Sequence, residues 1–174
     1  MKKIAVYCSA SDNVPRKYHE AAKALVDGLC RKGYAVVSGG SWRGVMGAVS
    51  DAAEEAGGYH KGVLPRFLGP YIFERLSETV WTETMSERKE NMRKDTVASI
   101  ALPGGIGTLD ELIETMVLIK LGQYKGKLYA FNQDGFYEPF KALLDHYVAE
   151  GMLIPEDREL IRFADSPEDI LAEL

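Results

Sequence analysis

The sequence is poor in cysteine and in long apolar runs. Its 174 residues include two cysteines, Cys8 and Cys30, which are too few for a disulfide-rich scaffold, so we expect a reducing, cytoplasmic location. The apolar run Ile4–Cys8 is too short for the hydrophobic region of a signal peptide, and no stretch approaches the ~18 apolar residues that span a bilayer. We therefore expect no membrane partner.

The sequence also has no excess of positive charge and no cluster of metal-ligating side chains. Lysine and arginine total 21 against 26 aspartates and glutamates, giving a formal charge of −5, whereas nucleic-acid-binding proteins usually carry a net basic face. The three histidines are isolated and lack metal-ligand spacing. We expect no nucleic-acid partner and no metal, while a small anionic ligand needs only a local positive site.

Short apolar, β-branched runs alternate with segments of helical periodicity, and we expect them to form one domain over residues 1–174. The predicted strands are Ile4–Cys8, Tyr34–Val37, Gly62–Leu64, Glu78–Thr82, Ser99–Leu102, Leu128–Phe131 and Leu160–Phe163. The predicted helices are one between Pro15 and Gly33, then Val45–Ala56, Met85–Thr96, Leu109–Leu121, Phe140–Val148 and a last one capped by Ser166. This alternation implies βαβ units, so the predicted fold class is α/β, a doubly wound, mostly parallel sheet with helices on both faces.

Two glycine-rich loops each follow a predicted strand and open a predicted helix. They are Ser38–Gly47 and Pro103–Thr108, and by this topology they lie at the same edge of the sheet. Glycine admits close approach to main-chain N–H groups, which bind anions at a helix N-terminus. Tight turns alone would explain either loop, but the pair predicts a phosphorylated ligand held at two points. Neither loop matches a dinucleotide or triphosphate fingerprint, so a nucleoside monophosphate or sugar phosphate fits better.

Two charged residues near these loops have two interpretations each. Thr108 and Glu111 have the spacing of a capping box, which fully explains the glutamate. Alternatively, the Glu111 carboxylate meets the ribose of a nucleotide, where it would stabilise the positive charge that develops when an N-glycosidic bond breaks. The charged run Ser86–Asp95 is typical of a solvated helix face, but Arg88 within it could also reach a ligand.

Three motifs together resemble the LOG ("lonely guy") family of cytokinin riboside 5′-monophosphate phosphoribohydrolases. Pro103–Glu111 matches the family signature P-G-G-x-G-T-x-x-E. Upstream, Gly39–Gly47 is similar to its G-G-x-x-x-G-x-M-G loop, and Met85–Met92 to its M-x-x-R-K-x-x-M segment. The resemblance runs in order from Ile4 to about Gly151.

The resemblance implies a Rossmann-like fold, a homodimer with its active site near the subunit interface, and hydrolysis of N6-modified adenosine 5′-monophosphates, AMP included. The products are the free base and ribose 5-phosphate, with no metal or cofactor. By the family pattern, Arg88 and Glu111 are the catalytic pair. The expected substrate-binding residues are Gly39, Gly40, Gly44, Met85, Lys89, Pro103, Gly104, Gly105, Ile106, Gly107 and Thr108.

The sequence departs from the family pattern at Ser41 and Arg43, and Trp42 is bulky for a phosphate loop, which leaves the preferred base open. Two other functions stay open: a general nucleoside 5′-monophosphate nucleosidase, and a carrier of a phosphorylated cofactor such as the molybdenum cofactor. Some family members are labelled lysine decarboxylase. That activity is not expected here, because Lys61 lies in a predicted strand and no aspartate partner for pyridoxal phosphate is identifiable.

Overall fold

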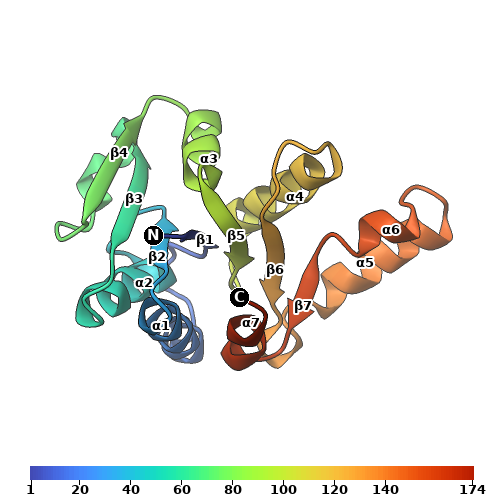
Figure 1. Ribbon diagram of the computed structural model, residues 1–174, viewed down its shortest axis with the longest axis horizontal. Coiled ribbons are helices and arrows are strands. Elements are labelled where there is room, and N and C mark those ends of the chain that lie inside the picture. The colour runs from blue at the N-terminus through green and yellow to red at the C-terminus, as the bar shows by residue number, and fades with distance from the viewer.

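All seven strands of the protein lie in one sheet, and every neighbouring pair is parallel. The computed structural model describes residues 1–174. The strand order is β4-β3-β2-β1-β5-β6-β7, which runs from left to right in Figure 1. The strands are β1 (Lys3–Tyr7), β2 (Ala35–Ser38), β3 (His60–Pro65), β4 (Glu78–Thr82), β5 (Thr96–Ala101), β6 (Lys127–Phe131) and β7 (Arg162–Ala164). The predicted fold class is confirmed.

Seven α-helices and two short 3₁₀ segments connect the strands. The helices are α1 (Arg16–Arg31), α2 (Gly44–Glu55), α3 (Met85–Arg93), α4 (Ile106–Lys120), α5 (Glu138–Ala149), α6 (Pro155–Arg158) and α7 (Pro167–Glu173), with 3₁₀ segments η1 (Arg66–Tyr71) and η2 (Gln133–Gly135). Figure 1 shows α1, α2 and α7 together below the strands, with α3 and α4 above them. None of the helices combines the length and apolar character needed to cross a lipid bilayer.

Side chains of the central strands alternate between two cores, one on each face of the sheet. On β1, Ile4 and Val6 pack with α1, α2 and α7, whereas Ala5 and Tyr7 pack with α3, α4 and α5. All four side chains are buried, as expected for a strand that is covered on both faces. The uninterrupted apolar run that predicted this strand therefore results from burial on both sides.

Several predicted boundaries were wrong by two or three residues, including the start of β5, which lies at Thr96 and not at Ser99. The helix predicted to continue to Thr96 ends at Arg93, because Asp95 takes a left-handed backbone conformation (φ 61°) and β5 begins immediately after it. The helix predicted to begin at Leu109 begins at Ile106, three residues earlier. The last strand lies at Arg162–Ala164, two residues later at its start than predicted, and the short helix α6 was not predicted.

The order of strands reverses between β1 and β5, which are neighbours in the sheet although they are distant in the chain. Loops that leave the carboxyl ends of these two strands turn in opposite directions and open a crevice between them. In open α/β sheets this crevice is where ligands bind.

Candidate active site

A cavity of about 360 Å³ lies at the carboxyl edge of the sheet, over the ends of β3, β2, β1 and β5. Its size falls within the ~300–1,000 Å³ that is usual for small-molecule sites. The walls come from five segments of the chain. They comprise Cys8, Ser9 and Ala10 after β1; Gly39, Ser41, Arg43 and Met46 after β2; Leu64, Leu68 and Tyr71 from β3 and η1; and Arg88, Gly105, Gly107, Thr108 and Glu111 from α3 and α4.

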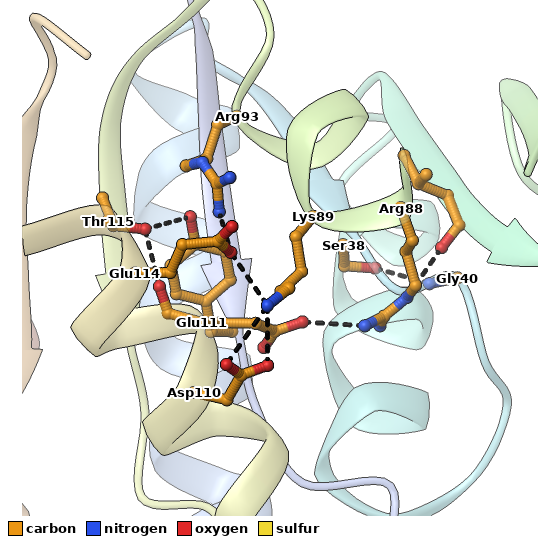
Figure 2. Close-up of polar contacts among 11 residues, drawn as sticks. Ser38, Gly40, Arg88, Lys89, Arg93, Asp110, Glu111, Glu114 and Thr115 are labelled. Carbon is orange, nitrogen blue, oxygen red and sulfur yellow. Dashed lines mark hydrogen bonds and ion pairs between the residues drawn. The ribbon is translucent and has the colours of Figure 1, made fainter. Parts of the chain in front are cut away.

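An ion pair between Arg88 and Glu111 forms part of the cavity wall. Nη1 of Arg88, on α3, donates to Oε1 of Glu111, on α4, at 2.8 Å, and the Arg88 Nε donates to the carbonyl of Val63 at 3.2 Å (Figure 2). The two side chains are 8% and 6% exposed. A buried ion pair usually adds little net stability, because desolvating both charges offsets their attraction, so its presence beside a cavity points to a functional role.

Burial is the main influence on the Glu111 carboxyl and raises its pKa above the ordinary value, while the Arg88 guanidinium opposes that rise. A carboxyl group with a raised pKa is suited to exchanging protons near neutral pH. The group therefore combines exposure to a cavity with the protonation behaviour of a general acid or base.

The capping-box interpretation of Glu111 is wrong. The residue before the first turn of α4 is Gly105, no side chain caps this helix, and Glu111 lies in the second turn with its carboxylate turned to Arg88. A capping box does occur on α3, where the Thr84 hydroxyl accepts from the Glu87 amide at 3.1 Å and the Glu87 carboxylate accepts from the Thr84 amide. Backbone capping therefore does not account for Glu111.

The N-terminus of α4 is open. The first backbone bond of the helix joins the Leu109 amide to the Gly105 carbonyl, so the amides of residues 106–108 have no partner within the helix. No acidic side chain lies in the first turn, and Gly105, Gly107 and Thr108 line the cavity. Free amides and the positive end of the helix dipole are features that favour anion binding.

At the N-terminus of α2, in the first glycine loop, polar groups of the protein itself take the place where an anion could bind. The Met46 amide donates to the Ser9 carbonyl at 3.0 Å. The Asp12 carboxylate accepts from the Arg43 Nε at 3.0 Å, and the Arg43 guanidinium, with the Gly44 amide, lowers the pKa of the Asp12 carboxyl. Gly44 (φ +56°) is also needed for packing, since a Cβ there would lie 2.4 Å from the Ser11 carbonyl oxygen.

The structure divides the predicted site residues into two groups. Those at the cavity wall are Arg88, Glu111, Gly39, Gly105, Gly107 and Thr108. Those outside the wall are Gly40, Gly44, Met85, Lys89, Pro103, Gly104 and Ile106. Several of the second group have clear packing roles: a Cβ on Gly40 would lie 2.8 Å from the Cα of Gly62, and one on Gly104 would lie 2.1 Å from the Thr108 hydroxyl.

Lys89 joins α3 to α4 (Figure 2). Its ammonium group lies 2.9 Å from Asp110 and 3.0 Å from Glu114, and Glu114 also accepts from Arg93 at 3.0 Å. The Lys89–Asp110 pair lies one residue away from Arg88 on α3 and from Glu111 on α4. Together these contacts fix the spacing of the two helices that carry the buried ion pair.

Sequence reasoning missed the wall made by Leu64, Leu68 and Tyr71, as well as the part of it made by Cys8–Ala10. Cys8, at the end of the first predicted strand, is buried, and burial raises the pKa of its thiol. The segment 67–75 has no periodicity to mark it. Its position after a predicted strand was the available signal, because every loop at this edge can reach a ligand.

The residues do not fit pyridoxal phosphate. Lys61 is buried in β3 outside the cavity wall, and its ammonium group lies 3.6 Å from the Glu78 carboxylate. No three His, Cys, Asp or Glu side chains gather in a way that could hold a metal ion.

Comparison with known proteins identifies relatives along the whole chain. A family model described as "possible lysine decarboxylase" matches residues 46–174. The cytokinin riboside 5′-monophosphate phosphoribohydrolase LOG of Oryza sativa subsp. japonica is 36% identical over 99% of this chain and 72% of its own length. A cytokinin riboside 5′-monophosphate phosphoribohydrolase of Arabidopsis thaliana is 33% identical over 98% of this chain and 81% of its own.

Solved structures share the architecture at lower identity. The molybdenum cofactor binding protein from the phototrophic bacterium Rippkaea orientalis superposes with a TM-score of 0.76 at 20% identity, covering 99% of this chain and 95% of that one. The molybdenum cofactor carrier protein from Chlamydomonas reinhardtii gives 0.73 at 21%, covering 99% and 94%. These likenesses show a common fold.

Proposed function

This chain belongs to the LOG family, and from that membership we propose that it hydrolyses the N-glycosidic bond of adenosine 5′-monophosphates. Water adds to C1′ of the ribose, the bond from C1′ to the base nitrogen breaks, and the products are the free base and ribose 5-phosphate. The substrates are AMP and its N6-modified forms. We assign the reaction to the chain's own side chains, with no cofactor.

The observation that carries this proposal is one cavity holding both an open helix N-terminus and a buried carboxylate. The amides at the start of α4 suit the 5′-phosphate, and Glu111 lies about one and a half turns along the same helix. A phosphate fixed there would hold the ribose against Glu111. Such positioning can remove ~7–11 kcal/mol from the barrier when it is complete.

In the proposed mechanism, the Glu111 carboxylate faces the positive charge that develops on the ribose as the bond to the base breaks, and it takes a proton from the attacking water. Arg88 holds that carboxylate in place through its bond to Oε1. The raised pKa of Glu111 favours this proton transfer. The leaving base takes up a proton from solvent, and Glu111 returns to solvent the proton it took from water, so that charge balances and the enzyme is restored.

The test is product identification with AMP and N6-isopentenyl-AMP as substrates. We expect release of adenine or the modified base together with ribose 5-phosphate, and Glu111→Gln to lower turnover by at least about a hundredfold while the protein stays folded. Glu87→Gln, which changes a carboxylate of α3 that lies outside the cavity wall, is the matched control and should keep wild-type turnover. Thermal stabilisation by nucleotide with no base release would instead indicate a carrier.

We also propose that the protein forms a homodimer through α4. Leu109, Ile113, Val117 and Leu121 are 37–62% exposed and recur every four residues, so they form one uncharged strip along the helix. A two-fold dimer uses the same patch on both copies, which suits a strip that can pack against itself. Because the strip begins beside the open N-terminus, the second copy would lie near the cavity.

The dimer is tested by light scattering after size-exclusion chromatography. Wild type should elute with twice the mass of the 19.3 kDa chain, and Val117→Glu should shift it toward the monomer, because a charge would be buried at the interface. Tyr147→Glu, on α5, is an exposed control that should not change the mass. A wild-type protein that elutes as a monomer at all concentrations would contradict the proposal.

A further inference from the structure

The two ends of the cavity differ in chemistry. At the β5 end are the open amides of α4, and at the β3 end is an apolar wall of Leu64, Leu68 and Tyr71. In the strand order, β5 and β3 are separated by three inter-strand spacings, or about 14 Å. A ligand that spans this distance with an anion at one end and a flat apolar group at the other matches both walls.

Arg43 brings a positive charge to the apolar end. The Arg43 guanidinium lies over the Tyr71 ring, 5.0 Å from its centroid, and lines the cavity with it. Asp12 accepts from the Arg43 Nε at 3.0 Å and from Nη2 at 2.5 Å, which fixes the guanidinium plane. An arginine held by a carboxylate and stacked on an aromatic ring is a rigid planar donor.

The backbone holds this wall in place. The Trp42 amide donates to the Tyr71 carbonyl at 3.0 Å, and the Phe73 amide donates to the Gly40 carbonyl at 2.8 Å. Ser41 and Ile72 form an isolated antiparallel bridge between the same two segments. The segment that carries Tyr71 is therefore tied to the loop that carries Arg43, and the two side chains keep a defined relative position.

We propose that Arg43, held over Tyr71 by Asp12, determines base specificity and favours unmodified adenosine 5′-monophosphate over forms with an alkyl group on N6. This rests on the proposed function. Ring nitrogens of a bare purine can accept hydrogen bonds from the guanidinium. An N6-alkyl chain at the same place displaces water from the guanidinium and returns no hydrogen bond, which costs free energy.

The test measures the ratio of kcat/KM for AMP to that for N6-isopentenyl-AMP. Wild type prefers AMP, and Arg43→Met, which keeps an unbranched side chain but removes the charge, lowers this ratio by about tenfold, mainly through KM. Arg31→Met is the matched control: Arg31 is also paired with an aspartate, Asp27, but lies on α1 outside the cavity, so the ratio stays at the wild-type value. Thermal melting checks that both variants are folded.

Inhibition by ribose 5-phosphate separates a base role from a phosphate role, because this product carries the anion but no base. We expect its inhibition constant to be unchanged in Arg43→Met. An inhibition constant that weakens as much as nucleotide binding would place Arg43 at the phosphate and overturn the inference. A kcat/KM ratio within about twofold of wild type in Arg43→Met would also overturn it.

Failure of the proposed function can be told apart from failure of the Arg43 role. If wild type released no base from either nucleotide, the proposed reaction would be refuted, and the same specificity would be measured as the ratio of the two dissociation constants. A shift of about tenfold in that ratio on Arg43→Met would still support the base-end role of Arg43. An unchanged ratio would refute that role as well.

Discussion

The two glycine loops look alike in sequence but differ in what their helix N-termini contact. At the start of α2, the Asp12 carboxylate and the Ser9 carbonyl approach from another loop and engage Arg43 and the Met46 amide. At the start of α4, no side chain caps the helix and the first turn has no acidic residue. Glycine allows an anion to approach the backbone closely, but contacts from a neighbouring loop can already occupy the helix N-terminus.

A carboxylate introduced at the N-cap of α4 would make this helix N-terminus resemble that of α2. Gly105→Asp should raise the KM for AMP by about a thousandfold, because an aspartate at this position occupies the amides and repels the phosphate. The same change should raise the free energy of unfolding by about 0.5–1 kcal/mol, since an N-cap carboxylate stabilises a helix. A Cβ at Gly105 meets no atom within 4 Å, so the side chain fits.

Kinetics and urea unfolding of the same sample measure both effects. Gly105→Ala is the control, since it adds a side chain without an acceptor and should leave KM within about threefold of wild type. If Gly105→Asp kept wild-type affinity for AMP, the α4 N-terminus would not be the phosphate site.

His60, on β3, contacts the start of the first glycine loop and should make the stability of the protein depend on pH. This buried histidine contacts the Ser38 hydroxyl at 2.8 Å, which accepts from the Gly40 amide, and burial lowers its pKa to about 4. Unfolded histidine titrates near 6.5, so between pH ~6.5 and ~4 the unfolded state binds more protons than the folded state. Lowering the pH through this range should therefore lower the free energy of unfolding, by up to about 3 kcal/mol.

Urea unfolding at a series of pH values tests this, with His60→Gln as the reference. Subtracting the variant isolates the histidine from Glu111, whose raised pKa acts in the opposite direction: it favours the folded state as pH falls. The variant should show a shallower decline than wild type below pH ~6.5. Parallel curves for the two proteins would show that His60 ionises freely in the folded state.

Glycines in the two loops should also differ in their tolerance of alanine. Gly44→Ala should lower the free energy of unfolding by about 1–3 kcal/mol, because its φ is +56° and the new Cβ would meet Ser11. Gly107→Ala has no such conflict and lies within a helix, so it should cost nothing or stabilise by about 0.5–1 kcal/mol. If Gly44→Ala and Gly107→Ala changed the free energy of unfolding equally, the first loop would not be more tightly packed than the second.

Much of this fold was predictable because its strands are short, buried on both faces and separated by helices with strong periodicity. The start of α4 was not, since glycine at 105 and 107 has a low helix propensity and tertiary contacts outweigh it. That error also produced the capping-box interpretation of Glu111. Once the helix begins at Ile106, Thr108 is inside it and Glu111 faces Arg88.

The family pattern paired Arg88 with Glu111, but it did not show which residues around them pack and which face the cavity. The two-point phosphate grip depended on α2 being free, and Asp12 lies 31 residues before Arg43, too far for local patterns to connect them. Lys89 shows the same limit: its partners Asp110 and Glu114 lie on another helix. Long-range ion pairs leave no periodic signal in a single sequence.

The most direct test of the account is a crystal structure of Glu111→Gln with AMP, a variant expected to bind the nucleotide without turning it over. The account predicts that the phosphate oxygens lie within hydrogen-bonding distance of the amides of residues 106–108, with C1′ of the ribose facing the side chain at position 111. A phosphate bound instead to Arg43 at the start of α2 would contradict it.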